Sequence, residues 1–400
     1  MPGEQGLDSA HSLPEREGSE EASAVQCPVH RLTITPCDSS EITPLLEHLD
    51  ANLAVQGSTR FPRGTLIDDG RLDLCKQSLG TENCLRIARA LRGNTRVKSL
   101  MLGTNAIGDT GAVAVAQLAC VNSHLEVLYL GCNNIGPEGA RLLGATLERE
   151  GQRLTGLWLK RNPLGPEGAA SIAQMVRDNR QLRVLDLVNT DLRDAGVRAL
   201  VDAICSGNNR LQSLYLSGNA LGPATAPTLA RLLREAQHLK ALYLSVNRLG
   251  DEGVVLLADG LRGNRSLQIL ELASNGIGAA GAKALFAAVA DTPLHTINLG
   301  YAPSTKVLGA EANCLGDEGA RAAADFIAGS TCLRKLDVVR NGMTGNGLAM
   351  LIEAARGHGQ MSQLEMDGVL PADLVEQLRA VGACSAVPAL DQDLIKSVYR

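Results

Sequence analysis

Aromatic residues are scarce in this sequence, and long apolar runs are missing. Of the 400 residues, 2% are aromatic, with five tyrosines, three phenylalanines and a single tryptophan. No apolar segment approaches the roughly 18 residues that a transmembrane helix needs, and the N-terminus lacks a basic region followed by an apolar one. We therefore expect a cytoplasmic protein that has no membrane partner.

A strong charge of one sign and closely spaced cysteines are also lacking. The net charge is −5, which gives no reason to expect nucleic acid as a partner. The ten cysteines include no CxxC pair and lack the dense spacing of a disulfide framework. Cys27 and His30 could supply two metal ligands, but a structural zinc site needs four. We predict reduced thiols, no bound metal and no cofactor.

Sequence motifs of common catalytic sites are absent as well. No Walker A loop, dinucleotide-binding glycine fingerprint or H-E-x-x-H helix occurs. Cys75 and Cys132 are expected on or beside an open sheet surface, but no histidine recurs in a register that places a base beside either thiol. We predict no catalytic residues and a protein that is not an enzyme.

The sequence instead contains extensive internal repetition. The pattern L-x-x-L-x-L-x-x-N-x-L-G-x-x-G recurs at intervals of 27 to 29 residues, except that the units starting at Leu294 and Leu333 are 39 residues apart. The unit starts are Asp69, Val97, Leu125, Leu154, Leu182, Leu211, Leu239, Leu267, Leu294, Leu333 and Met361. Such regular spacing predicts one structural unit per repeat.

Each part of the unit has a physical interpretation. The alternating leucines have the period of a short strand with one buried face. The asparagine predicts a ladder of turns whose backbone groups its amide can bond, with Gln77 and Thr190 as exceptions. A helix is expected to start near the second glycine, with Asp109, Asp251 and Asp317 as N-caps. Because neither element can bury its apolar face alone, the units must stack.

These units resemble leucine-rich repeats, and their length and G-x-x-G motif are similar to the ribonuclease-inhibitor class over about residues 69–366. The resemblance implies an α/β fold, a horseshoe-shaped solenoid with a concave parallel β-sheet and convex helices. We predict a disordered acidic tail over 1–26, an N-terminal cap over 27–68, about eleven units over 69–366 and a C-terminal cap over 367–400. An insertion near 301–312 is either a rim loop for binding or a tolerated insertion.

The residue between the last two leucines of each strand is expected to face the concave surface. Four of the five central units carry an aromatic residue there, so we predict a ridge on the order of 20 Å long, with strands about 4.8 Å apart. The predicted partner-binding residues are Tyr129, Trp158, Lys160, Arg161, Asp186, Tyr215, Tyr243, Glu271 and Tyr301.

Two alternatives for these residues stay open. Tyrosine and tryptophan also suit exposed strand positions for reasons of propensity alone, and Lys160 and Arg161 could form a surface ion pair with Asp186. In favour of binding, interface hot spots are enriched in Tyr, Trp and Arg. The positions Glu271, Asp337 and Glu365 add an acidic sector, which favours a partner with a basic patch.

We predict a non-enzymatic scaffold that binds a protein partner, of unidentified kind, on its concave face. The resemblance implies this, since ribonuclease inhibitors and the sensor regions of nucleotide-binding leucine-rich-repeat receptors bind through such surfaces. One alternative is a GTPase activator similar to the Ran GTPase-activating proteins, with Arg161 as the suspected residue, although the acidic tail usual in that family is missing. Another is a secreted bacterial effector that acts on a host.

The binding hypothesis predicts the behaviour of one double variant. Changing Trp158 and Tyr215 together to alanine is expected to weaken capture of the partner. Because both residues are expected on the surface, thermal unfolding should stay nearly unchanged.

Overall fold

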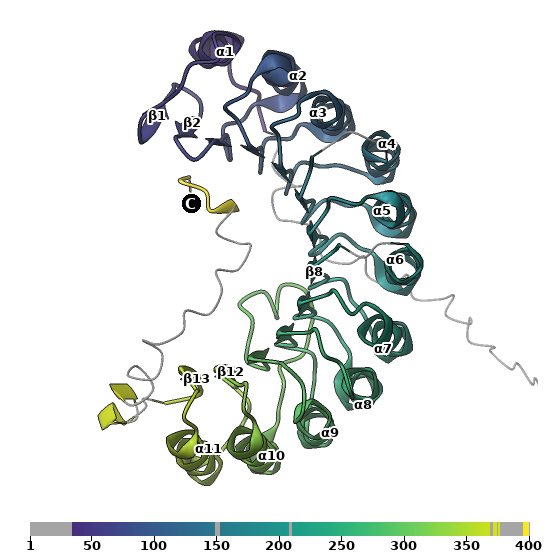
Figure 1. The fold of residues 1–400 in the computed structure, drawn as a ribbon, viewed down its shortest axis with the longest axis vertical. Helices are drawn as coiled ribbons and strands as arrows, with labels where there is room; N and C mark the ends of the chain where they lie inside the picture. The colour runs from purple at the N-terminus through teal and green to yellow at the C-terminus, as the bar shows by residue number, and fades with distance from the viewer. Residues whose placement is uncertain are drawn as a thin grey trace, which may run out of the picture.

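The computed structural model describes residues 34–148, 153–207, 210–368, 371–373, 375–376 and 395–399. Over these residues, strands and helices alternate along the chain and form a curved solenoid (Figure 1). The strands line the inner, concave side, and the helices lie next to one another on the outer, convex side. The predicted leucine-rich-repeat horseshoe is confirmed.

Within the described ranges, one sheet contains thirteen strands in chain order. They are β1 (Ser58–Arg60), β2 (Thr65–Ile67), β3 (Arg71–Asp73), β4 (Ser99–Met101), β5 (Val127–Tyr129), β6 (Gly156–Trp158), β7 (Val184–Asp186), β8 (Ser213–Tyr215), β9 (Ala241–Tyr243), β10 (Ile269–Glu271), β11 (Thr296–Asn298), β12 (Lys335–Asp337) and β13 (Gln363–Glu365). The α-helices are α1 (Thr43–Asp50), α2 (Gly80–Ala90), α3 (Gly108–Val121), α4 (Pro137–Leu147), α5 (Gly165–Asp178), α6 (Arg193–Ser206), α7 (Ala226–Glu235), α8 (Gly250–Leu261), α9 (Ala279–Val289), α10 (Gly316–Gly329) and α11 (Gly345–Gly357).

The strand register follows the repeat. From β3 to β13 the strands are parallel, and equivalent residues of neighbouring units face each other, as Leu128 faces Leu157 and Leu157 faces Leu185. The strands β1 and β2 pair antiparallel and extend the sheet at its N-terminal end. Helix α1 buries Leu45 and Leu49 over the same end of the core.

Some predicted segments fall outside the described residues. These are the tail over 1–26, residues 27–33 of the predicted N-terminal cap, and residues 369–370, 374, 377–394 and 400 of the predicted C-terminal cap. In the described part of that cap, the backbone N–H of Val375 donates to the carbonyl oxygen of Pro371, and Asp373 pairs with Arg356 at 2.8 Å. The division of the chain into these caps stays a prediction.

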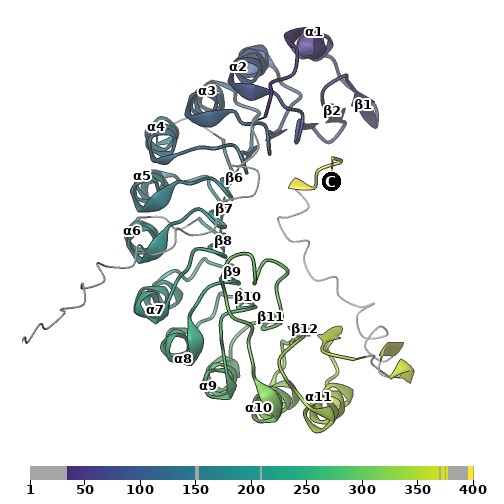
Figure 2. The same cartoon turned by 180° about the vertical axis from the view of Figure 1, so that it is seen from behind.

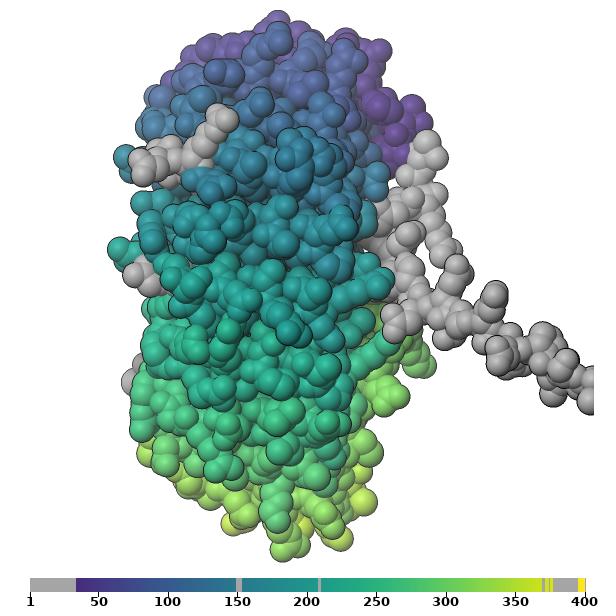
Figure 3. Space-filling view, turned by 90° about the vertical axis from the view of Figure 1, so that its right-hand side faces the viewer, coloured from purple at the N-terminus to yellow at the C-terminus, as the bar shows by residue number. Residues whose placement is uncertain are grey.

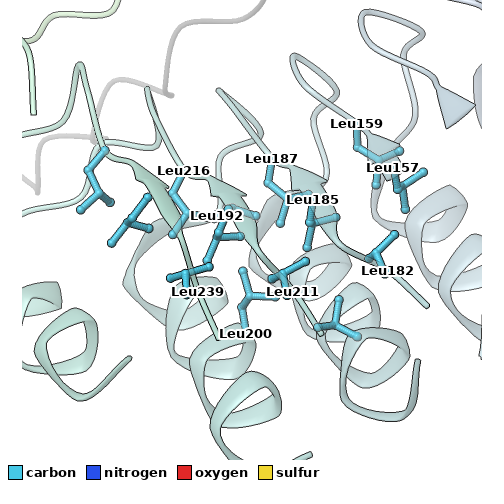
Figure 4. Packing of buried hydrophobic residues seen from close by; sticks show 14 of the residues in the cluster. Leu157, Leu159, Leu182, Leu185, Leu187, Leu192, Leu200, Leu211, Leu216 and Leu239 are labelled. Carbon is cyan, nitrogen blue, oxygen red and sulfur yellow. The ribbon is translucent and has the colours of Figure 1, made fainter. Parts of the chain in front are cut away.

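The core lies between the sheet and the helices. Figure 4 shows Leu157 and Leu185 pointing from their strands toward the helices, and Leu200 of α6 meeting this layer from the other side. All three leucines are fully buried. In Figure 3, which faces the convex side, the repeats form adjacent bands in chain order.

The predicted asparagine ladder is present. The side-chain amide of Asn133 donates to the carbonyl oxygens of Leu102 and Leu130, at 2.9 and 3.0 Å. Its side-chain oxygen accepts the backbone N–H of Asn105 at 3.0 Å. Each asparagine therefore satisfies buried backbone groups of two units, and the ladder links the turns along the solenoid.

The predicted helix starts need correction. Helices begin up to three residues before the second glycine, as α3 does at Gly108, and Asp109 lies inside the first turn rather than at the N-cap. Its carboxylate accepts the backbone N–H of Gly136, at the helix start of the next unit, at 2.7 Å. Asp251 and Asp317 likewise accept from the units that follow them. These aspartates connect repeats, because a carboxylate can accept from any nearby helix start with free N–H groups.

Thr190 interrupts the ladder and provides a test of its contribution. Its hydroxyl donates to the carbonyl oxygen of Leu187 at 2.8 Å, but a hydroxyl has one proton where an amide has two. We expect Thr190→Asn to raise the free energy of unfolding by about 1 kcal/mol, as measured by urea denaturation. The reverse change at a regular position, Asn219→Thr, should lower it. If Thr190→Asn lowered the free energy of unfolding, the turn ladder would not explain why most other units have asparagine at the equivalent position.

The insertion after β11 packs against earlier repeats. The hydroxyl of Ser274 accepts the backbone N–H of Ala302 at 3.0 Å and lies 2.7 Å from the hydroxyl of Thr305, which is buried. Leu308 lies against Gly218 in the turn after β8. In Figure 2 this loop reaches back over the ends of the strands toward β8 and β9.

Candidate functional site

The aromatic residues predicted for the concave face lie in one row across the sheet. Tyr129 of β5 faces Trp158 of β6, and Tyr215 of β8 faces Tyr243 of β9. Asp186 of β7 stands between Trp158 and Tyr215. The predicted register is therefore confirmed.

The expectation that this row is exposed is wrong for three of its members. Trp158, Tyr215 and Tyr243 are only 1, 5 and 2% exposed. The rings of Tyr215 and Tyr243 stack with centroids 3.9 Å apart and an interplanar angle of 3°, and Tyr129 is half-buried. Because large rings on neighbouring strands are close enough to cover one another, they form a small second core on the concave side.

Residues at the first position of four strands, β5, β7, β9 and β10, complete this second core. A strand of three residues exposes its first and third side chains on the same face, so both positions belong to the concave surface. We call the resulting group the concave cluster: Val127, Trp158, Val184, Tyr215, Ala241, Tyr243 and Ile269. The sequence prediction considered only the third position, although the same alternation also marks the first.

Gly156 explains how the tryptophan fits. It is the first residue of β6, and a Cβ added there would collide with the ring of Trp158. The six-membered ring of the indole therefore lies next to Gly156, and a side chain at this position would displace it.

Lysine and arginine follow the tryptophan at the edge of the cluster. The ammonium nitrogen of Lys160 lies 5.3 Å from the centroid of the Tyr129 ring, a cation–π contact. Arg161 is exposed. The positive φ of Arg161, 56°, belongs to the turn at the end of the strand.

Asp186 is a buried carboxylate among these groups. Its Oδ1 accepts the backbone N–H of Val188 at 2.9 Å. Burial raises the pKa of Asp186 to about 6, against the opposing effect of Lys160, the Val188 hydrogen bond and Arg161. At neutral pH the concave face therefore carries a poorly hydrated negative charge beside two cations.

The predicted acidic sector lies further along the sheet and carries its own cation. Burial raises the pKa of Glu271 to about 7; Lys335 opposes this shift and Asp337 adds to it. The ammonium of Lys335 pairs with Glu365 at 3.1 Å. Part of the acidic charge expected to attract a basic partner is thus balanced within the chain.

A cavity of about 410 Å³ opens beside Trp158. Six of the nine predicted partner-binding residues line it: Tyr129, Trp158, Lys160, Arg161, Asp186 and Tyr215. Tyr243 adjoins it through its stack on Tyr215. Glu271 and Tyr301 do not line it, and Tyr301 instead lies under the guanidinium of Arg340, 4.6 Å from the ring centroid.

Residues 395–399, which we call the C-terminal segment, form another wall of this cavity. Figures 1 and 2 show the segment in yellow beside the label C. It lies on the concave side, near the N-terminal strands β1 and β2. Ile395, Ser397 and Tyr399 line the cavity, and Ile395 packs against the concave cluster. The sequence prediction did not include these residues, because nothing in the repeat pattern says where a segment outside it will lie.

The nucleophilic and metal-binding candidates are limited in the described part of the chain. Burial and, to a smaller extent, the neighbouring Asp73 raise the pKa of Cys75 to about 12, so its thiol stays protonated at neutral pH. No group of three or more His, Cys, Asp or Glu residues that could hold a metal ion is found in the described ranges. Cys27 and His30 lie outside them.

No helix in these same ranges is both long enough and apolar enough to cross a membrane.

Comparison with known proteins shows what the repeats are similar to. A leucine-rich-repeat model matches residues 93–116, 121–144, 178–201, 235–258, 263–286 and 329–351. A NACHT, LRR and PYD domains-containing protein 3 from Macaca mulatta is 29% identical over 38% of this chain, and a ribonuclease inhibitor from Mus musculus is 26% identical over 22% of it. These matches span 15% and 19% of the length of the two relatives.

Among solved structures, the actin-binding site 2 of leiomodin-1 aligns with 42% of this chain and 90% of its own, at 20% identity and a TM-score of 0.34.

Proposed function

We propose that this chain, a leucine-rich-repeat protein of the ribonuclease-inhibitor-like kind, is a non-enzymatic scaffold that binds a protein partner on its concave face. Leucine-rich repeats indicate a protein-interaction scaffold, and the partner is a further step of the proposal. The observation that carries it is the cavity of about 410 Å³, in which aromatic rings lie beside a buried carboxylate and two cations.

The chemistry of the cavity supports binding rather than catalysis. Its wall combines large apolar rings with a few charged groups, the composition of interface hot spots. Arg161, the residue suspected for a GTPase activator, is followed by Asn162, whose side-chain amide is already bonded to the carbonyl oxygens of Leu130 and Leu159. Asn162 therefore has a structural role in the turn ladder.

Charge reversal at the edge of the cavity tests the proposed surface. The double variant Lys160→Glu and Arg161→Glu leaves the concave cluster intact and changes the charge that a partner would meet. We expect it to reduce capture of the partner from a cell extract by about tenfold or more, because like charges are placed where the complex needs opposite ones.

The matched control is Arg198→Glu, an exposed arginine on the convex helix α6. Capture by wild type and by Arg198→Glu should agree in quantitative mass spectrometry, and so should their thermal unfolding. The charge-reversal variant should unfold at a lower temperature, because it removes the cations beside Asp186, so capture is compared well below the unfolding transition of all three proteins. A partner that is lost equally with both variants, or with neither, would place binding away from the concave face.

A further inference from the structure

We propose that the concave surface around Trp158 and β3 is a binding site for an extended peptide, and that the C-terminal segment of this chain lies on it as a resident ligand that walls the cavity. The proposal rests on the proposed function, because it names the form that a partner takes on the concave face. A partner would present an extended segment there in place of residues 395–399.

Main-chain groups of the C-terminal segment are held by side chains of β3. The backbone N–H of Val398 donates to Oδ2 of Asp73 at 2.7 Å. The guanidinium of Arg71 donates to the carbonyl oxygen of Lys396 at 2.9 Å. These two contacts use only backbone atoms of the segment, so any extended peptide in the same position can make them.

The contact to Asp73 is the one that defines a site. This side chain is fully buried, at 0% exposed, and its other oxygen accepts the backbone N–H of Cys75 at 3.0 Å. A buried carboxylate oxygen needs a donor, and the donor to Oδ2 is the backbone of the segment. The sheet thus presents an acceptor that a bound main chain satisfies.

The side chains of the segment alternate, as they do in an extended strand. Ile395, Ser397 and Tyr399 line the cavity, whereas Val398 points away and is 55% exposed. This period of two is the pattern by which strand-like ligands are recognised.

Each inward side chain has its own environment. Ile395 packs on the concave cluster that contains Trp158, Ser397 lines the cavity together with Cys75, and the hydroxyl of Tyr399 lies 2.5 Å from that of Thr65. The site therefore fits an extended segment with an aliphatic residue, a small hydroxyl residue two places on and a tyrosine two places beyond that.

Covalent attachment favours the resident segment over a free peptide. A tethered ligand has a high effective concentration at its site. A partner therefore binds only if its own concentration and affinity are high enough to displace the segment. Removal of the segment should therefore increase the affinity of the cavity for a peptide added in solution.

The single tryptophan is a reporter of occupancy. We would compare the full chain with a chain that ends at Leu394, exciting tryptophan selectively. The shortened chain should show Trp158 emission at longer wavelength and stronger quenching by acrylamide, because Ile395 no longer covers the cluster. A synthetic peptide with the sequence of residues 393–400, D-L-I-K-S-V-Y-R, should reverse both changes with saturation.

The control peptide has the same composition with Ile and Tyr exchanged, D-L-Y-K-S-V-I-R, so that no register presents an aliphatic residue, a small hydroxyl residue and a tyrosine at successive inward positions. It should bind the shortened chain about tenfold more weakly or worse, because the inward contacts are lost. In the shortened chain, Asp73→Asn should weaken the first peptide by about the same factor, because it replaces the acceptor for the backbone N–H. Unchanged Trp158 emission on shortening, or equal binding of both peptides, would overturn the proposal.

These results are separable from those on the proposed function. If charge reversal abolishes capture but the peptide does not bind the shortened chain, the concave face binds a partner in another way and only the peptide site is rejected. If the peptide binds in register but charge reversal has no effect on capture, the peptide site stands and the proposed partner surface is rejected.

Discussion

Trp158→Ala is expected to lower the free energy of unfolding by about 3–5 kcal/mol, the range for removing a large aromatic side chain from a core. The indole is 1% exposed and lies over Gly156, within the concave cluster. Its loss leaves a cavity that Gly156 cannot fill, because a glycine has no side chain to move into it. Urea denaturation of wild type and variant measures the difference.

Trp158→Phe is the matched control, because it keeps a ring over Gly156 and should cost clearly less than the alanine change. If Trp158→Ala cost less than about 1 kcal/mol, the ring would be a surface group and its burial would have no energetic weight. The burial also corrects the expectation that Trp158 and Tyr215 can both become alanine without an effect on thermal unfolding. Weaker capture by that double variant would not distinguish binding from folding.

Asp186→Asn is expected to stabilise the protein at neutral pH. The pKa of Asp186 is raised from 3.8 to about 6, so the folded state disfavours the charged form. Below pH 3.8 Asp186 is protonated in both the folded and the unfolded state and costs the protein no stability. As the pH rises through about 6, the carboxylate ionises in the folded state as well, and the free energy of unfolding falls. Asparagine does not ionise, so the variant should gain up to about 3 kcal/mol above that range, the equivalent of two pKa units.

The pH dependence separates this effect from a change in packing. The difference in the free energy of unfolding between Asp186→Asn and wild type, measured by urea denaturation across pH, should vanish toward pH 3.8.

Asp317→Asn is the control with the opposite sign. Hydrogen bonds from Thr344 lower the pKa of Asp317, so its replacement should destabilise the protein above the ordinary pKa of an aspartate and have little effect below it. A pH-independent gain for Asp186→Asn would contradict the charge-burial explanation.

The repeat could be predicted because its determinants are local. Leucines at alternating positions determine which side of each strand is buried, and Asn133 bonds backbone groups only one unit away. The same leucine and asparagine positions recur in most units, so the assignment of buried and turn residues in one unit can be checked against the others. Strand register, core and turn ladder all follow from this repetition.

The errors concern contacts between units. Asp109 has the spacing of an N-cap, but its carboxylate bonds Gly136 of the following unit, because stacking brings that helix start within reach. Trp158 was placed on the correct face, but its exposure depends on the neighbours that stacking supplies and on Gly156. A pattern within one unit does not contain that information.

The sequence alone therefore determined the solenoid, the direction of each strand side chain and the position of the aromatic row. Only the tertiary structure decided that this row is largely buried, that Asp186 is a desolvated charge, and that residues 395–399 lie against Asp73. The physical reason is the separation along the chain of the residues that interact. Periodicity encodes interactions between neighbours in the chain, whereas the site is made where residues 325 positions apart meet.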